Sequence, residues 1–179
     1  LLHDVVEDCD GITVEDIARE FGTDIAEMVD GVTKLTKTGK SDIISKEEAQ
    51  AENLRKMFLA IAKDVRVVII KLTDRLHNMR TMEYMVAQKQ LEKSLETMEI
   101  YAPIAHRLGL QKVKWELEDL SLKYLDPDGY REIITYLDSK ADVLNEFMSD
   151  VKKKITDRLT EYSIHATVQS RIKHTYSIY

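Results

Sequence analysis

The first eight residues read LLHDVVED (residues 1–8), and their spacing predicts a helix with reactive side chains gathered on one face. Residues four apart lie on the same side of an α-helix, so His3 is next to Glu7. By the same rule Asp4 is next to Asp8. Carboxylates are rarely buried unless they are paired or bound to a metal ion, yet these lie among leucines and valines that prefer a core. Taken alone, the stretch leaves two interpretations open, an exposed acidic helix face or a binding or catalytic helix, and a second stretch is needed to favour the latter.

A second stretch, VVIIKLTDRLHNMRT (residues 67–81), is apolar at first and then abruptly polar. Asp74, Asn78 and Thr81 follow helical spacing and form one stripe. An aspartate at the end of a buried apolar run is costly unless a positive charge meets it. The stretch thus predicts a buried helix that brings Asp74 to a cation.

A divalent cation would satisfy both stretches at once. His3 offers an imidazole nitrogen, and Asp4 and Asp74 offer carboxylate oxygens. Such mixed ligation is typical of manganese, iron, zinc or magnesium rather than of soft ions bound by thiolates. Glu7 and Asp8 are placed to orient or deprotonate a metal-bound water, and the resulting hydroxide would attack a phosphorus atom. The pattern therefore predicts metal-dependent phosphate chemistry.

Several strings of this sequence resemble the HD-superfamily phosphohydrolases, in the version found in RelA/SpoT (long Rel) enzymes, which make and destroy the alarmone (p)ppGpp. The strings are LLHDVVED (1–8), AENLRKM (51–57), KLTDRLHNMRT (71–81), IYAPIAHRLGLQKVKWELEDLSLKYL (100–125) and RIKHTYSIY (171–179). The resemblance covers nearly the whole chain, and the last three strings are specific to RelA/SpoT proteins rather than to HD proteins at large.

The resemblance implies a hydrolase site with named roles. His3, Asp4 and Asp74 would bind the metal ion, with manganese (Mn²⁺) the usual ion, and Glu7 and Asp8 would activate the attacking water. The reaction would remove the 3′-pyrophosphate from ppGpp or pppGpp and leave GDP or GTP. The parent would be a stringent-response protein that also synthesises (p)ppGpp from ATP and GDP or GTP.

The resemblance also implies two sets of nucleotide contacts. Asn78 and Thr81 would touch the sugar of the (p)ppGpp substrate. Arg171 and Lys173 would match residues that help to bind ATP phosphates at the start of the family's synthetase domain. Because that domain stops almost at once in this sequence, we expect no pyrophosphate transfer from the chain itself.

In the family, further residues of the hydrolase site lie upstream of the segment that matches this sequence. The family takes a further histidine ligand, and a basic and small-polar cluster that grips the base and phosphates, from upstream segments that this sequence does not include. We therefore expect weak metal binding and little or no hydrolysis from this chain alone. The HDxxED residues are kept, so the parent is expected to be hydrolase-competent and to meet the ribosome or regulators through regions outside this sequence.

The fold is expected to be all-helical: an HD-domain helical bundle over residues 1–110 and linking helices over residues 111–162. Over residues 163–179 we expect the beginning of an α/β synthetase domain. Apolar residues alternate with polar ones from residue 163 to 169, which predicts that domain's first strand.

Local signals predict where helices begin and break. Thr13 and Asp64 are each placed as N-terminal caps. Residues 36–46 are polar and contain a glycine, which predicts a mobile loop, either a plain connector or a lid that meets phosphates. Pro103 lies within a helical pattern over residues 89–108 and predicts a kink or a break there.

Composition narrows the class of protein. With 179 residues, the length fits one domain, or one domain and the start of another. A net charge of −6 gives no electrostatic footprint for nucleic acid. The single cysteine, Cys9, allows no disulfide framework and favours a reducing cytoplasm. No apolar stretch is long enough for a membrane span, so we expect a cytoplasmic protein without membrane contact.

Two alternatives to (p)ppGpp hydrolysis remain open from the sequence. The chain could be a non-catalytic regulatory module, whose helices over residues 111–162 transmit the occupancy of one active site to another. It could also be an HD phosphohydrolase that acts on a different nucleotide.

Overall fold

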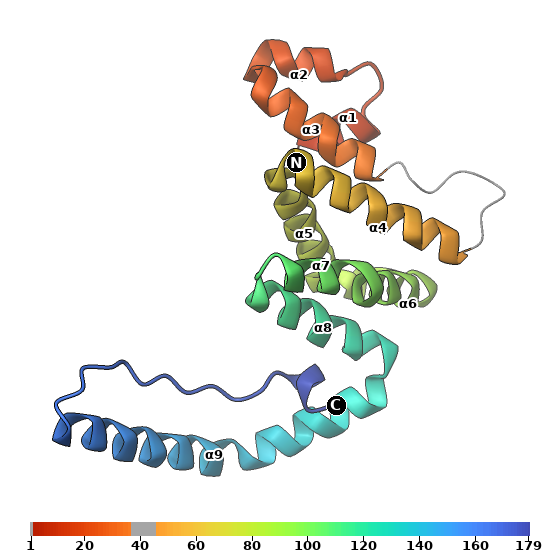
Figure 1. Cartoon of the computed structure of the whole chain (residues 1–179). Coiled ribbons are helices and arrows are strands. Elements are labelled where there is room, and N and C mark those ends of the chain that lie inside the picture. Colours follow the sequence, from red (N-terminus) through yellow and green to blue (C-terminus); the bar gives the residue numbers. More distant parts are fainter. Residues whose placement is uncertain (1, 37–45) are drawn as a thin grey trace.

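The computed structural model describes residues 2–36 and 46–179. Every regular element in these residues is helical, which confirms the predicted all-helical fold. The helices are stacked from an N-terminal group at the top of Figure 1 to one long helix at its base. Almost all of the loop predicted over residues 36–46 lies outside the described residues. None of the described helices is both long enough and apolar enough to span a membrane.

The N-terminal group has a small hydrophobic core of its own, around Ile17, Ala26 and Val29. Its helices are α1 (Leu2–Asp8), α2 (Val14–Phe21) and α3 (Thr23–Thr36). The predicted cap of α2 is confirmed, because the Thr13 hydroxyl accepts from the Asp16 backbone N–H at 3.3 Å. The Asp16 carboxylate accepts from the Thr13 backbone N–H at 2.9 Å, which completes a capping box.

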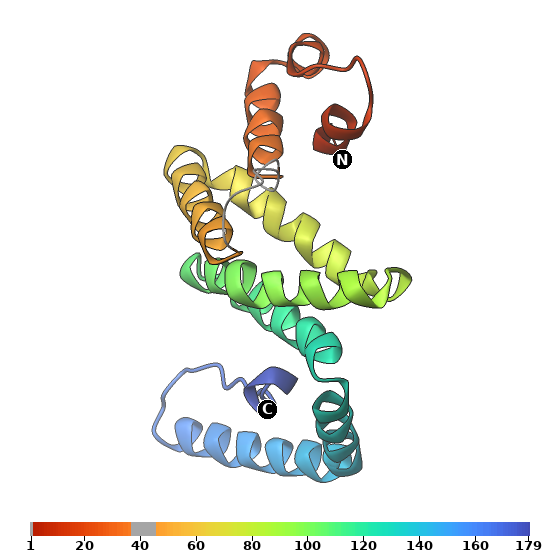
Figure 2. The same ribbon diagram turned by 90° about the vertical axis from the view of Figure 1, so that its right-hand side faces the viewer.

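The larger core surrounds α5, whose Val68, Leu72 and Met79 are almost fully buried. Its helices are α4 (Lys46–Lys63), α5 (Val65–Arg80), η2 (Met82–Tyr84), α6 (Ala87–Glu96), η3 (Thr97–Tyr101), α7 (Ala102–Arg107) and α8 (Gln111–Leu125). Asp64 caps α5 as predicted, since its carboxylate accepts from the Arg66 backbone N–H at 2.9 Å. Figure 2 shows α5 running obliquely between the N-terminal group and the layer of α6, α7 and α8.

The helical pattern over residues 89–108 is disturbed just before Pro103, by a change of helix type instead of a break. The element η3 between α6 and α7 is a π-helical turn, in which the Ala102 backbone N–H donates to the Thr97 carbonyl, five residues back. Proline cannot donate a backbone hydrogen bond, and its ring crowds the carbonyl four residues before it. The widened turn lets α7 begin with Pro103 in its first positions while the chain stays helical.

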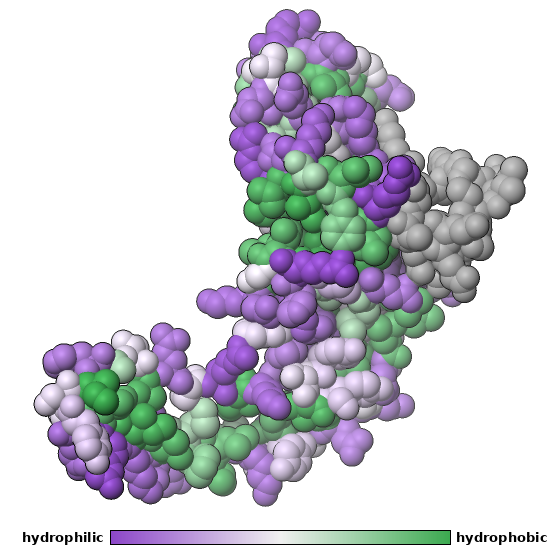
Figure 3. Space-filling view, in the orientation of Figure 1, coloured by the Kyte–Doolittle hydropathy of each residue, from purple (hydrophilic) through white to green (hydrophobic). Residues whose placement is uncertain are grey.

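The last helix, α9 (Pro127–Glu161), extends away from both cores and buries none of its residues. Figure 3 shows an apolar band along this limb, and Val143 and Phe147 are among its exposed residues. Residues 164–174 then run back beside α9 toward α8 (Figure 1). The strand predicted over residues 163–169 does not form, because a strand needs a neighbouring strand to pair with and the described residues contain none.

The returning segment ends in η4 (Thr175–Ser177), which is held on α8 by backbone and side-chain contacts. The Asp119 carboxylate accepts from the backbone N–H groups of Thr175 and Tyr176, at 3.3 and 2.7 Å. His174 Nε2 lies 3.2 Å from Glu118 Oε2. These contacts join residues more than fifty positions apart and close the C-terminal limb into a loop.

Candidate active site

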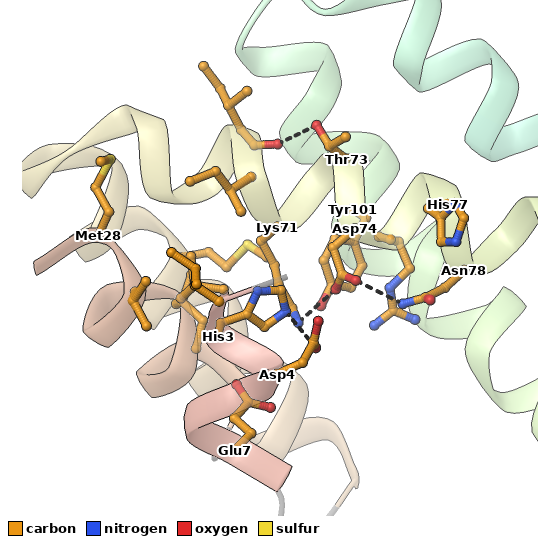
Figure 4. Close-up of a pocket in the computed structure, with 18 of the residues that line it drawn as sticks. His3, Asp4, Glu7, Met28, Lys71, Thr73, Asp74, His77, Asn78 and Tyr101 are labelled. Atoms are coloured by element: carbon orange, nitrogen blue, oxygen red, sulfur yellow. Dashed lines mark hydrogen bonds and ion pairs between the residues drawn. The ribbon is translucent and has the colours of Figure 1, made fainter. Parts of the chain in front are cut away.

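A cavity of about 1200 Å³ lies where the N-terminal group meets the larger core. Its walls come from α1 and α3 on one side and from α5, α6 and η3 on the other. Figure 4 shows the polar side chains that line it. Ligand pockets usually measure roughly 300–1000 Å³, so this cavity has room for a nucleotide.

On the α1 side, His3 is buried, with 6% of its surface exposed. Its Nε2 lies 3.1 Å from Asp4 Oδ1. Glu7 lies one turn further along the helix, and its Oε1 is buried without a hydrogen-bond partner among the described residues. A buried carboxylate oxygen without a donor is costly, so Glu7 is a candidate for a group that meets a ligand or a metal-bound water.

On the α5 side, Asp74 is held by two neighbours on its own helix. Its Oδ2 accepts from Lys71 Nζ at 3.0 Å, and its Oδ1 accepts from Asn78 Nδ2 at 3.3 Å. These residues are three and four positions away, the spacings that share a helix face. Figure 4 shows the Lys71 ammonium directed toward Asp74, with Asp4 close by.

The structure brings most of the predicted hydrolase residues to one cavity. The lining includes His3, Asp4, Glu7, Asp74 and Asn78. The other two, Asp8 and Thr81, are exposed and are not part of the lining. The hydroxyl of Thr81 donates to the His77 carbonyl at 3.2 Å, at the C-terminal end of α5.

The donor types around the cavity fit a divalent cation. One imidazole, two carboxylates and the partnerless Glu7 oxygen form the mixture of nitrogen and oxygen ligands that such ions prefer. In the described conformation, however, no three histidine, cysteine or acidic side chains among the described residues stand close enough together to hold an ion. The cation beside Asp74 is instead the ammonium of Lys71, 3.0 Å away.

The cavity also contains a basic group that the sequence analysis missed. Arg75 is 5% exposed, and its Nη2 lies 3.0 Å from Glu96 Oε2. Lys93 Nζ contacts the same oxygen at 3.1 Å, and the Arg75 guanidinium lies 4.0 Å from the centre of the Tyr101 ring. The available signal was two cations, Lys71 and Arg75, four residues apart on a helix that the sequence predicts to be buried, where a solvated face is not expected.

Burial and charge act in opposite directions on this group. Burial alone would lower the pKa of the Arg75 guanidinium, but Tyr101 and Glu96 outweigh it and the pKa lies above its ordinary value. Burial alone would raise the pKa of the Glu96 carboxyl, but Arg75 and Lys93 outweigh it and the pKa lies below its ordinary value. Arg75 and Glu96 are therefore both charged at neutral pH.

The residues predicted to bind ATP lie elsewhere. The guanidinium of Arg171 stacks over the Trp115 ring of α8, 4.1 Å from its centre. Lys173 is exposed on the segment that returns to α8. Neither residue lines the cavity, so the two predicted sites are separate in this chain.

Known proteins resemble this chain over most or all of its length. Residues 1–111 match the family described as HD domain. Over 99% of its length, the chain is 50% identical to the "Probable guanosine-3′,5′-bis(diphosphate) 3′-pyrophosphohydrolase" of Synechocystis. Over its whole length, it is 49% identical to a GTP pyrophosphokinase of Streptomyces coelicolor and 45% identical to the bifunctional (p)ppGpp synthase/hydrolase SpoT of Escherichia coli.

The chain spans 23%, 20% and 25% of the lengths of these three relatives. The match to the HD domain covers more than half of the chain, and it contains every residue that lines the cavity. The chain therefore belongs to the HD-domain family, within its RelA/SpoT branch.

Proposed function

We propose that the protein to which this chain belongs removes the 3′-pyrophosphate from ppGpp and pppGpp, giving GDP or GTP. The observation that carries the proposal is the convergence of α1 and α5 on one cavity large enough for a nucleotide. The imidazole and carboxylates come from segments about seventy residues apart. Relatives that are 50% and 45% identical to this chain are named as a (p)ppGpp hydrolase and a bifunctional (p)ppGpp synthase/hydrolase. A structural helix pair would not need acidic groups on both sides of such a cavity.

In this proposal His3, Asp4 and Asp74 hold the divalent ion, which we expect to be Mn²⁺. Such an ion lowers the pKa of a bound water and offsets charge that develops on phosphate oxygens. Glu7 accepts the proton of the attacking water, because its buried Oε1 has no donor among the described residues. Asp8 is assigned to orienting this water from the end of α1.

We also propose the division of the chain into parts. Residues 1–110 are the hydrolase domain, residues 111–162 are linking helices, and residues 163–179 open the synthetase domain. Asn78 and Thr81 contact the sugar, and Arg171 and Lys173 belong to the ATP site of the synthetase. Contacts with the ribosome or regulators are left to other parts of the longer protein.

The test uses a longer form of the protein that includes the family's additional histidine, incubated with Mn²⁺ and either ppGpp or deoxynucleoside triphosphates. Release of pyrophosphate from ppGpp alone is the expected result. Release of phosphate or triphosphate from deoxynucleotides would instead support a different nucleotide substrate. In the same protein, Asp74→Asn is expected to abolish metal-dependent turnover, and full activity of this variant would contradict the ligand assignment.

A second candidate function, signal transmission by the linking helices, is favoured by the docking of residues 174–176 on α8. Through this contact, the C-terminal end of the chain binds to α8, and α8 packs against the cavity helices α5 and α6. Hydrogen exchange over residues 111–162 with and without ppGpp tests it. A ligand-dependent change in a protein without turnover would favour this role over hydrolysis.

A further inference from the structure

One wall of the cavity carries a buried cation whose hydrogen bonds are incomplete. Arg75 is 5% exposed and lines the cavity. Its Nη2 reaches Glu96, but its Nη1 is buried and has no hydrogen-bond partner among the described residues. A guanidinium stays charged inside a protein, so it cannot relieve this cost by losing a proton.

The charges around Arg75 do not balance. Arg75 and Lys93 both contact the single oxygen Oε2 of Glu96, at 3.0 and 3.1 Å. Two cations share one carboxylate, which leaves one net positive charge at this wall of the cavity. Lys71 does not alter this sum, because its ammonium is paired with Asp74. Arg75 is the buried cation of the two, since the Lys93 side chain is 47% exposed. An excess of positive charge at a sheltered cavity wall favours an anion.

The basic group and most of the acidic residues come from different helices. His3, Asp4 and Glu7 come from α1, whereas Arg75 follows Asp74 on α5, and Lys93 and Glu96 come from α6. The cavity thus has an acidic part, suited to a metal ion, and a basic part, suited to phosphate. A nucleotide with diphosphates on two positions of its ribose could place one group at each part.

We propose that Arg75, supported by Lys93, binds the non-reacting diphosphate of the substrate. The inference rests on the proposed function for the choice of substrate, since it assigns the second phosphate chain of a guanosine bis(diphosphate). Nη1 of Arg75 donates to a phosphate oxygen, and Glu96 holds the guanidinium in place through Nη2. Arg75 and Lys93 would thereby favour substrates that carry this second diphosphate, although no bond of that diphosphate is broken in the reaction.

The experiment measures the binding of inorganic pyrophosphate to the chain by calorimetry, with EDTA present so that no metal ion contributes. Arg75→Gln is expected to weaken binding by about tenfold or more, because it removes a hydrogen bond to a charged group. The matched control is Arg80→Gln, since Arg80 is also on α5 and also pairs with a glutamate, Glu116, but lies outside the cavity lining. This control is expected to bind pyrophosphate as the unaltered chain does.

A second variant keeps the test decisive if Arg75→Gln fails to fold. Glu96→Gln keeps a side-chain oxygen that can accept from Arg75 Nη2 but removes the negative charge that offsets both cations, so pyrophosphate should bind several-fold more tightly. A purely structural Arg75 predicts no gain. Absence of pyrophosphate binding to the unaltered chain, equal loss in the Arg80 control, or no gain in Glu96→Gln would each overturn the proposal. Pyrophosphate binding that depends on Arg75, in a protein that does not turn over ppGpp, would support this site and count against the proposed function.

Discussion

At the scale of single residues, the arrangement around Asp74 shows how one helix prepares its own acidic group. Lys71 and Asn78 flank Asp74 at positions three before and four after, so the helix itself fixes the contacts of both carboxylate oxygens. The side chains of Lys71 and Asp74 are 10% and 24% exposed. A pair this sheltered from water is screened weakly by salt, so its loss leaves a poorly solvated charge.

Lys71→Gln is therefore expected to lower the free energy of unfolding by about 1–3 kcal/mol, because Asp74 loses its cation in a sheltered place. The matched control is Lys34→Gln on α3, which removes an exposed partner of Asp30 and is expected to cost less than about 0.5 kcal/mol. Urea unfolding at pH 7 measures both. Equal effects in the two variants would show that the Lys71 pair is no more sheltered than an ordinary surface pair.

The carboxyl group of Glu96 makes the free energy of unfolding depend on pH. The pKa of its carboxyl in the folded protein lies below the ordinary 4.5, so the folded state binds this proton less readily than the unfolded state. The stabilisation is complete above about pH 4.5 and is lost as the pH falls through the depressed folded value.

Unfolding free energy should thus fall more steeply below pH 4.5 in the unaltered chain than in Glu96→Gln. The control is Glu92→Gln, since Glu92 is an exposed residue of the same helix. Denaturant unfolding across this pH range measures the difference. Parallel pH profiles for the unaltered chain and Glu96→Gln would contradict the assignment of the dependence to Glu96.

At the scale of helices and turns, the start of α2 is set by two side chains. Thr13 and Asp16 satisfy each other's backbone N–H groups, and α2 then supports the small core that carries α1. The position of His3 and Asp4 therefore depends on a cap outside the cavity.

Thr13→Ala is expected to cost about 1 kcal/mol of stability, the usual effect of losing an N-terminal cap. Thr13→Ser keeps a hydroxyl at the same place and should retain most of that stability. Thermal unfolding of the three proteins tests the expectation. A loss in Thr13→Ser as large as in Thr13→Ala would show that the methyl group, and not the cap, is responsible.

The sequence predicted elements that depend on neighbouring residues better than those that depend on distant ones. The caps at Thr13 and Asp64 are local hydrogen bonds, and both are confirmed. The strand over residues 163–169 failed because alternation of apolar and polar residues gives only one half of a pair of strands. A π-helical turn was also out of reach, because Pro103 signals a disturbance without specifying its form.

In the candidate site, too, local relations could be predicted from the sequence and contacts between distant helices could not. His3 with Glu7, and Asp74 with Asn78, could be paired from helical spacing alone, and the structure brings both pairs to one cavity. The basic group could not be found in this way, since Arg75 meets Glu96 from another helix, twenty-one positions further along. Only the packing of α5 against α6 reveals that Arg75 has a carboxylate at Nη2 and no hydrogen-bond partner at Nη1 among the described residues.

At the scale of the whole molecule, two cores and a long limb meet at a few contacts. The cavity lies between the cores, so its shape depends on how α1 and α3 sit on α5. The limb closes on α8 through Asp119, which accepts from Thr175 and Tyr176. These hydrogen bonds join residues that are more than fifty positions apart. Breaking them would release the C-terminal segment from α8.

Asp119→Ala should free the returning segment without unfolding the helices. Trypsin is then expected to cleave after Arg171 and Lys173 several-fold faster, because a protease needs a locally open chain. The control is Asp128→Ala, which changes an exposed acidic residue at the start of α9 whose carboxylate pairs with Arg131 on the same helix. Cleavage at the same rate in all three proteins would show that Asp119 does not hold the segment.

The π-helical turn over Thr97–Tyr101 is the place in this helix where a change of chain length costs least. Its closing hydrogen bond reaches the fifth residue back instead of the fourth, so the turn accommodates one residue more than an α-helical turn does. Deleting a single residue here would restore the α-helical hydrogen-bond pattern and leave α6 and α7 facing nearly the same way. The same deletion inside α7 would rotate every residue beyond it by roughly 100° about the helix axis.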